Sequence, residues 1–290
     1  MKTLTTAAEM QLAAAGLRGL DKRIGFVPTM GALHEGHLAL VRRAKKECDA
    51  TVASLFVNPA QFGPHEDYLK YPRDLERDTA LLSREGADLL FAPSVGEIYP
   101  DGFQTYAMVE GTAAPLEGQF RPGHFRGVAT VVLKLFNLVQ PHAAYFGQKD
   151  AQQCAVIRRM VRDLNLPLEI VVCPIVREPD GLALSSRNAY LKPGERLAAL
   201  ALYRSLCRAR ELIEAGERRA DELIRQMRAL LEAAPGSRID YVAVADADSF
   251  EPRPTVSGRT VIALAVWIGG TRLIDNLIVE QTGGRFAFHL

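Results

Sequence analysis

The sequence predicts an α/β protein with a doubly wound parallel sheet, followed by a second, smaller α+β domain. Strand-like and helix-like segments alternate up to about residue 175, which is typical of parallel βαβ units. The pattern changes near Pro174 to Pro179, where two long helical segments and then three strand-like runs follow. We therefore expect a Rossmann-like domain over residues 1–178 and a smaller α+β domain over residues 179–290.

The elements of the first domain follow from the spacing of its apolar residues. The apolar run Ile24 to Val27 predicts a buried strand, and Leu38 to Cys48 has the spacing of an amphipathic helix. Ala50 to Val57 is almost continuously apolar, as expected of a strand buried on both faces. The same two periodicities predict, in order, helix Asp74–Arg84, strand Asp88–Ala92, helix Val128–Val139, strand Ala143–Phe146, helix Asp150–Asp163 and strand Leu168–Val172.

The second domain is predicted from two helical stretches and three strand-like runs. Pro235 and Gly236 end the second helix. The expected elements are helices Pro193–Ala215 and Arg219–Ala233, then strands Ile239–Ala245, Thr260–Val266 and Arg272–Val279.

Composition and charge narrow the class of protein. Of the 290 residues, 48% are hydrophobic and 24% are charged, which is typical of a soluble globular protein. The formal net charge of +1 argues against a nucleic-acid partner, and the longest apolar run, Val261 to Ile268, is too short to span a membrane. The N-terminal segment lacks the apolar core of a signal peptide. Because Cys48, Cys154, Cys173 and Cys207 have no metal-ligand or redox spacing, we expect reduced thiols in a cytoplasmic protein.

Two histidines three residues apart, His34 and His37, follow the first predicted strand at the start of a helix. Unpaired N–H groups and the positive end of the helix dipole make this position suitable for phosphate. Neutral imidazoles, which the dipole favours, can donate hydrogen bonds to phosphate oxygens. Gly31 and Gly36 let a ligand approach the backbone, and Gly36 can open space for a flat base. The segment therefore predicts a nucleotide phosphate site, with simple capping of the helix as the alternative.

Several segments resemble known families. His34-Glu35-Gly36-His37 resembles the histidine signature of nucleotidyltransferases and class I aminoacyl-tRNA synthetases, which bind ATP and transfer AMP. Over about residues 24 to 190 the chain then resembles the pantothenate synthetase family in six ordered segments. These are Phe26–His37, Phe56–Gly63, Tyr71–Arg73, Arg121–Val128, Phe146–Gln153 and Ser185–Asn188.

Two positions depart from the family pattern. Leu184 stands where the family often has Met, and the similar volume of the two side chains predicts little consequence. Ala60 stands where the family often has a larger residue, which could widen the pocket slightly. The last hundred residues or so resemble the family's smaller domain in length and pattern, but less specifically.

The resemblance implies an ATP-dependent ligase that condenses pantoate with β-alanine. Pantoate would first form a pantoyl adenylate and release pyrophosphate, and β-alanine would then displace AMP to give pantothenate. The resemblance also implies a homodimer. Mg²⁺ is expected with ATP, since the phosphate charge must be neutralised, but its protein ligands cannot be named from the sequence.

The resemblance implies an ATP site in two parts of the chain. The first part is Met30, Gly31, Ala32, Leu33, His34, Glu35, Gly36 and His37. The second part is Gly147, Gln148, Lys149, Asp150, Val176, Leu184, Ser185, Ser186 and Arg187. His34, His37 and Lys149 are the catalytic candidates, and the Val176 backbone would contact adenine.

Residue chemistry supports these positions, although each has a simpler reading. Lys149 could neutralise phosphate oxygens as a point charge, or it could be a surface lysine paired with Asp150. The hydroxyls and guanidinium of Ser185 to Arg187 suit a pyrophosphate clamp, but such a segment can also be a solvated turn.

The substrate candidates are two neutral amides and one orienting residue. Neutral amides could hold pantoate without quenching its carboxylate. The resemblance implies that Gln61 and Gln153 are such pantoate ligands and that Gln61 also lies near β-alanine, whereas each glutamine by itself would be read as a surface residue. Asn58 would orient the same loop. Tyr71, Arg73 and Asp78 are weaker candidates. For Arg121, His124 and Arg126, in a Gly/Pro-rich loop, a role near the substrates and a role in helix capping are equally supported.

Three other functions compete with the ligase. A nucleotidyltransferase would keep AMP on its product, but the paired glutamines argue against it. A non-catalytic nucleotide sensor would tolerate loss of Lys149 or His37, which this chain retains. A nucleic-acid binder is disfavoured by the near-neutral charge.

Overall fold

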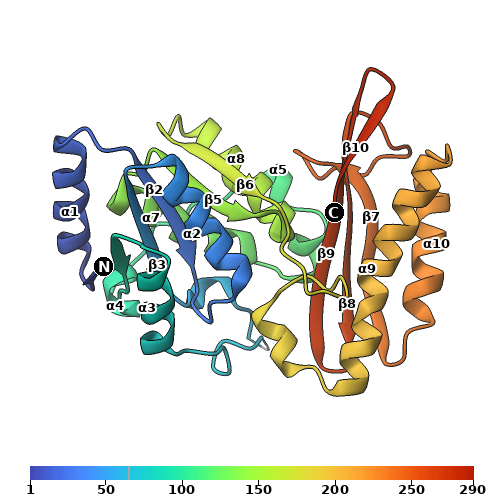
Figure 1. The fold of residues 1–290 in the computed structure, drawn as a ribbon, viewed down its shortest axis with the longest axis horizontal. Helices are drawn as coiled ribbons and strands as arrows, with labels where there is room; N and C mark the ends of the chain where they lie inside the picture. Colours follow the sequence, from blue (N-terminus) through green and yellow to red (C-terminus); the bar gives the residue numbers. More distant parts are fainter. Residues whose placement is uncertain (65) are drawn as a thin grey trace. The chain divides into compact units, whose positions relative to one another are not determined.

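Figure 1 shows the computed structural model of the chain, which describes residues 1–64 and 66–290. The chain forms two compact units. The first comprises Met1–Gly147 and Val156–Cys173, and the second comprises Gln148–Ala155 and Pro174–Leu290. The boundary near residue 178 remains a prediction.

The first unit is built on a six-stranded sheet in which all neighbouring strands are parallel. The spatial order is β1-β4-β3-β2-β5-β6. The strands are β1 (Lys2–Leu4), β2 (Ile24–Thr29), β3 (Ala50–Leu55), β4 (Leu89–Phe91), β5 (Ala143–Gly147) and β6 (Glu169–Cys173). The predicted doubly wound parallel sheet is confirmed.

Helices pack on both faces of this sheet, because neighbouring residues of a strand point to opposite sides. On one face Phe26 packs edge-on against Phe136, with ring centroids 6.4 Å apart. On the other face Val27 lies in a buried cluster with Val41 and Ala44. The longer helices are α1 (Ala7–Gly19), α2 (Glu35–Glu47), α3 (Leu75–Arg84), α7 (His124–Val139) and α8 (Ala151–Asp163), whose residues are divided between the two units. The short elements are η1 (Pro59–Gln61), α4 (Val95–Ile98), α5 (Glu110–Ala113) and α6 (Glu117–Phe120).

The direction of chain progression reverses between β2 and β5. From β2 the chain passes to β3 on one side, and it returns to β5 on the other side. β2 pairs with β3 over six positions, but it pairs with β5 over only two, Gly25 with Ala143 and Phe26 with Ala144. In doubly wound sheets, ligands bind outside the carboxyl ends of the strands at such a reversal. The segment that follows β2 therefore begins at the expected ligand-binding end.

The second unit contains a four-stranded antiparallel sheet in the order β10-β9-β8-β7. Its strands are β7 (Ser237–Asp246), β8 (Arg259–Ile268), β9 (Thr271–Thr282) and β10 (Arg285–His289). Its helical elements are η2 (Gln148–Asp150), η3 (Ser186–Tyr190), α9 (Pro193–Glu214) and α10 (Ala220–Glu232). Apolar residues of α9, α10 and strands β7 to β9 form one buried core. The predicted smaller α+β domain is confirmed as a fold class.

Some elements were missing from the sequence prediction. β1 and α1 were not predicted, because only Met10 and Ala14 of α1 are buried and its apolar stripe is narrow. Thr6 begins α1 in a capping box with Glu9, and this local signal was overlooked. β10 was also missed, since only alternate residues of this short strand pack against the core.

The segment expected as a Gly/Pro-rich loop before residue 128 is partly helical. α7 begins at His124, four residues before the predicted start, so His124 and Arg126 lie in its first turn. Gly123, with a φ of 83°, takes the left-handed conformation at the N-cap, and Phe125 is buried. The loop assignment of these two residues was wrong.

Candidate functional site

The turn between β2 and α2 has a backbone that most residues avoid. Gly31 has a φ of 84° and Ala32 a φ of 51°, both in the left-handed region. The buried carboxylate of Asp78 accepts the Ala32 N–H at 2.7 Å and the Leu33 N–H at 3.0 Å. A side chain at Gly31 would place Cβ 3.0 Å from Asp78 Oδ2, so the glycine is needed for this close approach. Asp78, from the first turns of α3, thus holds the turn in its strained conformation.

The two histidines lie at the start of α2, as the sequence predicted. His34 is the N-cap residue, and its imidazole lies near that of His37, with ring centroids 4.1 Å apart. His37 Nδ1 accepts the backbone N–H of His34 at 3.4 Å. A neutral His37 must then carry its proton on Nε2, which makes Nε2–H the hydrogen-bond donor.

The space beside Gly36 is filled by the His34 imidazole and is not open. A Cβ built at Gly36 would lie 3.0 Å from Cε1 and Nδ1 of His34. The glycine therefore allows the His34 ring to lie over the first turn of α2. The expectation that Gly36 opens space for a base is not what this geometry shows.

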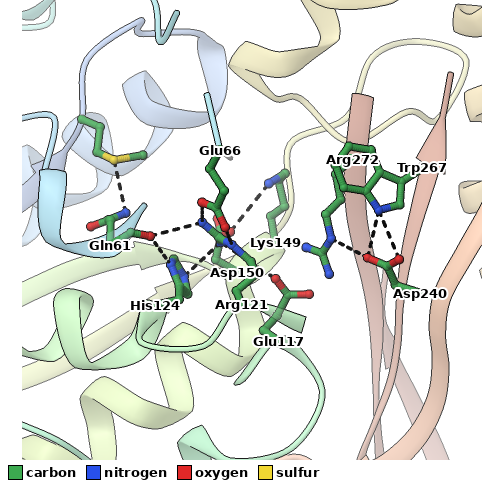
Figure 2. A network of polar contacts seen from close by, with 11 residues as sticks. Gln61, Glu66, Glu117, Arg121, His124, Lys149, Asp150, Asp240, Trp267 and Arg272 are labelled. Atoms are coloured by element: carbon green, nitrogen blue, oxygen red, sulfur yellow. Dashed lines mark hydrogen bonds and ion pairs between the residues drawn. The ribbon is translucent and has the colours of Figure 1, made fainter. Parts of the chain in front are cut away.

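Asn58 and Gln61, the predicted substrate residues that precede and end η1, are hydrogen-bonded to each other. Asn58 Nδ2 donates to Gln61 Oε1 at 3.0 Å and to the carbonyl oxygen of Gly127 at 3.1 Å. Asn58 Oδ1 accepts from the Tyr99 hydroxyl at 2.8 Å, and Asn58 is only 1% exposed. Gln61 Nε2 lies 3.2 Å from Met30 Sδ. Figure 2 draws this contact as a dashed line from Gln61 to the sulfur atom. The structure brings together three residues of the predicted site in the first unit.

The residues whose role the sequence left open lie beside this loop. Arg121 and His124 form a buried network with Gln61, which Figure 2 shows as a chain of dashed lines. Arg126 instead lies over the ring of Tyr106, with its guanidinium carbon 3.6 Å from the ring centroid. This cation–π contact is consistent with a structural position for Arg126.

Lys149 and its neighbours belong to the second unit. Lys149 Nζ lies 3.7 Å from Asp150 Oδ1, and its side chain is 21% exposed. Asn276 on β9 donates its amide hydrogens to the carbonyl oxygens of Gln148 and Lys149, each at 3.0 Å. The Gln148 amide donates to the carbonyl oxygen of His289 at 2.7 Å. Asn276 therefore holds the main chain on which Lys149 is carried.

The predicted pyrophosphate clamp, Ser185 to Arg187, follows a short antiparallel turn in the second unit. The Leu184 N–H donates to the carbonyl oxygen of Val176 at 3.0 Å, and Arg177 pairs with Ala183 as an antiparallel bridge. Ser185 is the N-cap of η3, where its hydroxyl accepts the Arg187 N–H at 3.3 Å. Ser185 to Arg187 are thus consecutive at the start of a short helix.

The structure places the predicted site residues in two groups. Those from Met30 to Gln61, with Gly147 at the end of β5, belong to the first unit. Those from Gln148 to Asp150, Gln153 in α8, and Val176 to Arg187 belong to the second unit. Asp78 is only a weak candidate from the sequence, and Tyr99 and Asn276 are not candidates, because contacts between segments distant in the chain leave no local sequence pattern.

Metal-binding clusters and membrane-spanning helices are absent from the residues that the structure describes. In residues 1–64 and 66–290, no group of three or more His, Cys, Asp or Glu side chains is arranged to hold a metal ion. Over the same ranges, no helix combines the length and the apolar character needed to cross a bilayer.

Comparison with known proteins identifies the family. The family described as Pantoate-beta-alanine ligase matches residues 2–278. Pantothenate synthetase from Roseiflexus sp. (strain RS-1) is 60% identical over 280 residues, covering 97% of this chain and 100% of the relative. The relative from Moorella thermoacetica, with the same name, is 57% identical over 97% of this chain and 99% of its own length.

Solved structures give the same result. The crystal structure of pantothenate synthetase from Thermus thermophilus has a TM-score of 0.91 and 52% identity, covering 96% of this chain and 99% of that one. Pantoate-beta-alanine ligase from Francisella tularensis, in complex with beta-gamma ATP and beta-alanine, has a TM-score of 0.78 and 36% identity. That match covers 98% of this chain and 100% of the other.

The chain therefore belongs to the pantoate-beta-alanine ligase family. It is an enzyme, an ATP-dependent ligase that condenses pantoate with β-alanine. The family resemblance and the reaction predicted from the sequence are confirmed.

Proposed function

We propose that the chain performs this condensation in two steps, with ATP bound at the turn between β2 and α2. In the first step a pantoate carboxylate oxygen attacks the α-phosphorus, the bond to the β-phosphate bridging oxygen breaks, and pyrophosphate leaves. In the second step the β-alanine amine attacks the acyl carbon, AMP leaves with the electrons of the C–O bond, and the amine proton passes to solvent. A carboxylate requires this activation, because oxide would be its leaving group.

The observation that carries the proposal is the pair His34 and His37 at the N-terminus of α2, beside the point where the strand order reverses. A helix N-terminus and two imidazole donors suit a triphosphate whose charge moves toward the leaving pyrophosphate. We propose that Met30 to His37 bind ATP and that both histidines donate as neutral groups. An NMR titration in which either imidazole is still charged at pH 8 would contradict the neutral form.

The second group of residues is proposed to act on the same ATP. Lys149 would neutralise phosphate oxygens, with Asp150 as its resting partner at 3.7 Å. Ser185, Ser186 and Arg187 would clamp the pyrophosphate. The remaining proposed contacts to ATP are Gly147, Gln148, Val176 through its backbone, and Leu184.

Pantoate is proposed to lie on neutral amides. Gln61 and Gln153 would hydrogen-bond its hydroxyls and carboxylate, and Asn58 would orient Gln61. An arginine on the same carboxylate would make it less nucleophilic, whereas an amide holds it without full neutralisation. Support for Asn58 is its buried hydrogen bond to Gln61 Oε1 at 3.0 Å.

Mg²⁺ is proposed to enter with ATP and to neutralise the phosphate charge. Mg²⁺ usually keeps waters and phosphate oxygens as ligands, so it needs no dedicated cage of protein side chains. We also propose a homodimer, to be tested by sedimentation equilibrium. A cytoplasmic location is proposed from Cys48, Cys154, Cys173 and Cys207, which are all free thiols.

The proposed intermediate is tested by isotope exchange. With pantoate present and β-alanine absent, the enzyme should exchange labelled pyrophosphate into ATP, and added β-alanine should then release AMP. His34→Ala and His37→Ala should each lower this exchange by about 10²–10³ without loss of the fold. His289→Ala, at a half-exposed imidazole 3.6 Å from Glu280, is the matched control and should exchange normally. Normal exchange in the His34 and His37 variants would refute the assignment.

A further inference from the structure

The first unit holds Gln61 with a set of buried contacts that the reaction steps do not use. Arg121 forms a two-point ion pair with Glu66, at 2.8 Å from Nε and 2.6 Å from Nη2. Arg121 Nη1 lies 3.1 Å from His124 Nε2, and His124 Nδ1 lies 2.9 Å from the carbonyl oxygen of Gln61. Arg121 Nη2 donates to the same oxygen over a longer distance, 3.4 Å. Figure 2 shows this series running from Glu66 to Gln61.

The partners decide which nitrogen of His124 carries the proton. A guanidinium can only donate, so Nε2 must present its lone pair to Arg121. A carbonyl oxygen can only accept, so Nδ1 must carry the hydrogen that points to Gln61. His124 is therefore the neutral tautomer protonated at Nδ1. Burial, and then the cation of Arg121, lower the pKa of His124 to about 4, which agrees with a neutral ring.

The orientation of the Gln61 side chain is decided in a similar way. Asn58 Oδ1 accepts the Ala60 N–H at 3.2 Å, so the other atom of the Asn58 amide is Nδ2. Asn58 Nδ2 then donates to Gln61 Oε1, which leaves Nε2 of Gln61 on the side of Met30. Gln61 thus presents its two N–H donors, and not its oxygen, toward the turn that follows β2.

The contact between α7 and η1 leaves little freedom for this arrangement. A Cβ at Gly127 would lie 2.2 Å from the carbonyl oxygen of Ala60 and 2.6 Å from the Gln61 nitrogen. Real Cβ atoms do not come so close, so the backbones are in direct contact. The hydrogen bond from His124 on α7 to the carbonyl oxygen of Gln61 therefore acts on the Gln61 main chain and not on its side chain.

We propose that His124 is a positioning residue for the pantoate site: held by Arg121 as the Nδ1-protonated tautomer, it fixes the Gln61 main chain so that the Gln61 amide donates to pantoate oxygens. The inference rests on the proposed function, since it takes Gln61 as a pantoate ligand. His124 itself does not touch substrate in this arrangement. Its loss should therefore weaken pantoate binding and leave the ATP-binding turn, which Asp78 holds, in place.

Two substitutions of His124 test the roles of the two ring nitrogens independently. In His124→Asn the amide nitrogen can replace Nδ1 and still donate to Gln61. In His124→Gln the amide oxygen can replace Nε2 and still accept from Arg121, but the shorter of the two hydrogen bonds to the Gln61 carbonyl oxygen is lost, and only the 3.4 Å bond from Arg121 Nη2 remains. We expect His124→Gln to raise the KM for pantoate about five- to tenfold, the worth of one hydrogen bond, and His124→Asn to raise it about twofold or less. The KM for ATP should change by less than about twofold in both.

A measurement on the unaltered enzyme keeps the inference testable if a variant fails to fold. The ¹⁵N shifts of the His124 ring, assigned by difference from the Asn variant or by site-specific labelling, should show a proton on Nδ1 alone at pH 7. A proton on Nε2, or equal KM values for pantoate in two folded variants, overturns the inference. If the unaltered enzyme shows no pantoate-dependent pyrophosphate exchange, the proposed function fails, whereas the tautomer measurement still decides the state of His124.

Discussion

Replacing Asp78 by Asn should loosen the turn that is proposed to bind ATP while it leaves the shape of the side chain unchanged. The Asp78 carboxylate accepts two backbone N–H groups, from Ala32 and from Leu33, and it is only 2% exposed. An asparagine keeps one oxygen for one N–H, but its NH₂ group must face the other. Two donors then oppose each other beside a backbone that already has two left-handed residues, Gly31 and Ala32.

The magnitude follows from the bonds involved. A hydrogen bond to a charged group contributes about 1.5–3 kcal/mol, and a buried donor left without an acceptor costs about 1–3 kcal/mol. Because these two terms describe partly the same loss, we expect a total near 3 kcal/mol. For a unit of this size that corresponds to a fall in Tm of about 6–12 °C. A displaced turn should also raise the KM for ATP at least about tenfold, equivalent to about 1.4 kcal/mol.

The assay combines thermal unfolding with the pyrophosphate exchange at varied ATP. Asp88→Asn is the matched control, because Asp88 Oδ2 also accepts a backbone N–H, from Thr51 at 2.8 Å, but its side chain is 41% exposed. The control should unfold at a slightly lower temperature and keep its KM for ATP. If Asp78→Asn lowered the Tm and bound ATP normally, the two hydrogen bonds would have no part in forming the ATP site.

Three further predictions concern the surroundings of the site. Gly127→Ala should raise the KM for pantoate more than tenfold, since its Cβ would lie 2.2 Å from the carbonyl oxygen of Ala60; normal pantoate kinetics would contradict that contact. Asn276→Asp puts a carboxylate against the carbonyl oxygen of Lys149 at 3.0 Å, and we expect about tenfold slower pyrophosphate exchange in a folded protein. His124 is stabilising in its neutral form, because burial and the Arg121 cation lower its pKa from 6.5 to about 4 while Glu117 and Glu66 oppose this shift. Its contribution, about 3 kcal/mol, is complete above pH 6.5 and is lost as the pH falls toward 4, so the free energy of unfolding of His124→Asn should depend less on pH in this range.

Elements with a strong local pattern could be predicted from the sequence. β2 and α2 are adjacent in the chain, and the periodicity changes from a continuous apolar run to helical spacing between them. The position of His34 and His37 at a helix N-terminus follows directly from that change. The strands of the second unit were found for the same reason, since β8 is almost continuously apolar.

Contacts between distant segments could not be predicted in this way. Asp78 is 46 residues from Ala32, and Asn276 is 128 residues from Gln148, so each contact depends on the tertiary fold and leaves no local sequence pattern. Glycines and a proline around His124 predict a loop, whereas the structure places it in the first turn of α7. The packing of Gly127 against Ala60 outweighs the weak helix propensity of that segment.

Pro28 explains why the sheet parts at the end where ATP is proposed to bind. Even-numbered residues of β2 direct their main-chain groups toward β5, as the bond from His142 N–H to the Ile24 carbonyl shows. Pro28 has no N–H to offer on that side, and the β2–β5 ladder stops at Phe26. Pro28 thus prevents further backbone hydrogen bonds between β2 and β5 beyond Phe26. With an ordinary residue at this position, β2 could donate one more hydrogen bond to β5, and the two strands would be paired further toward their carboxyl ends.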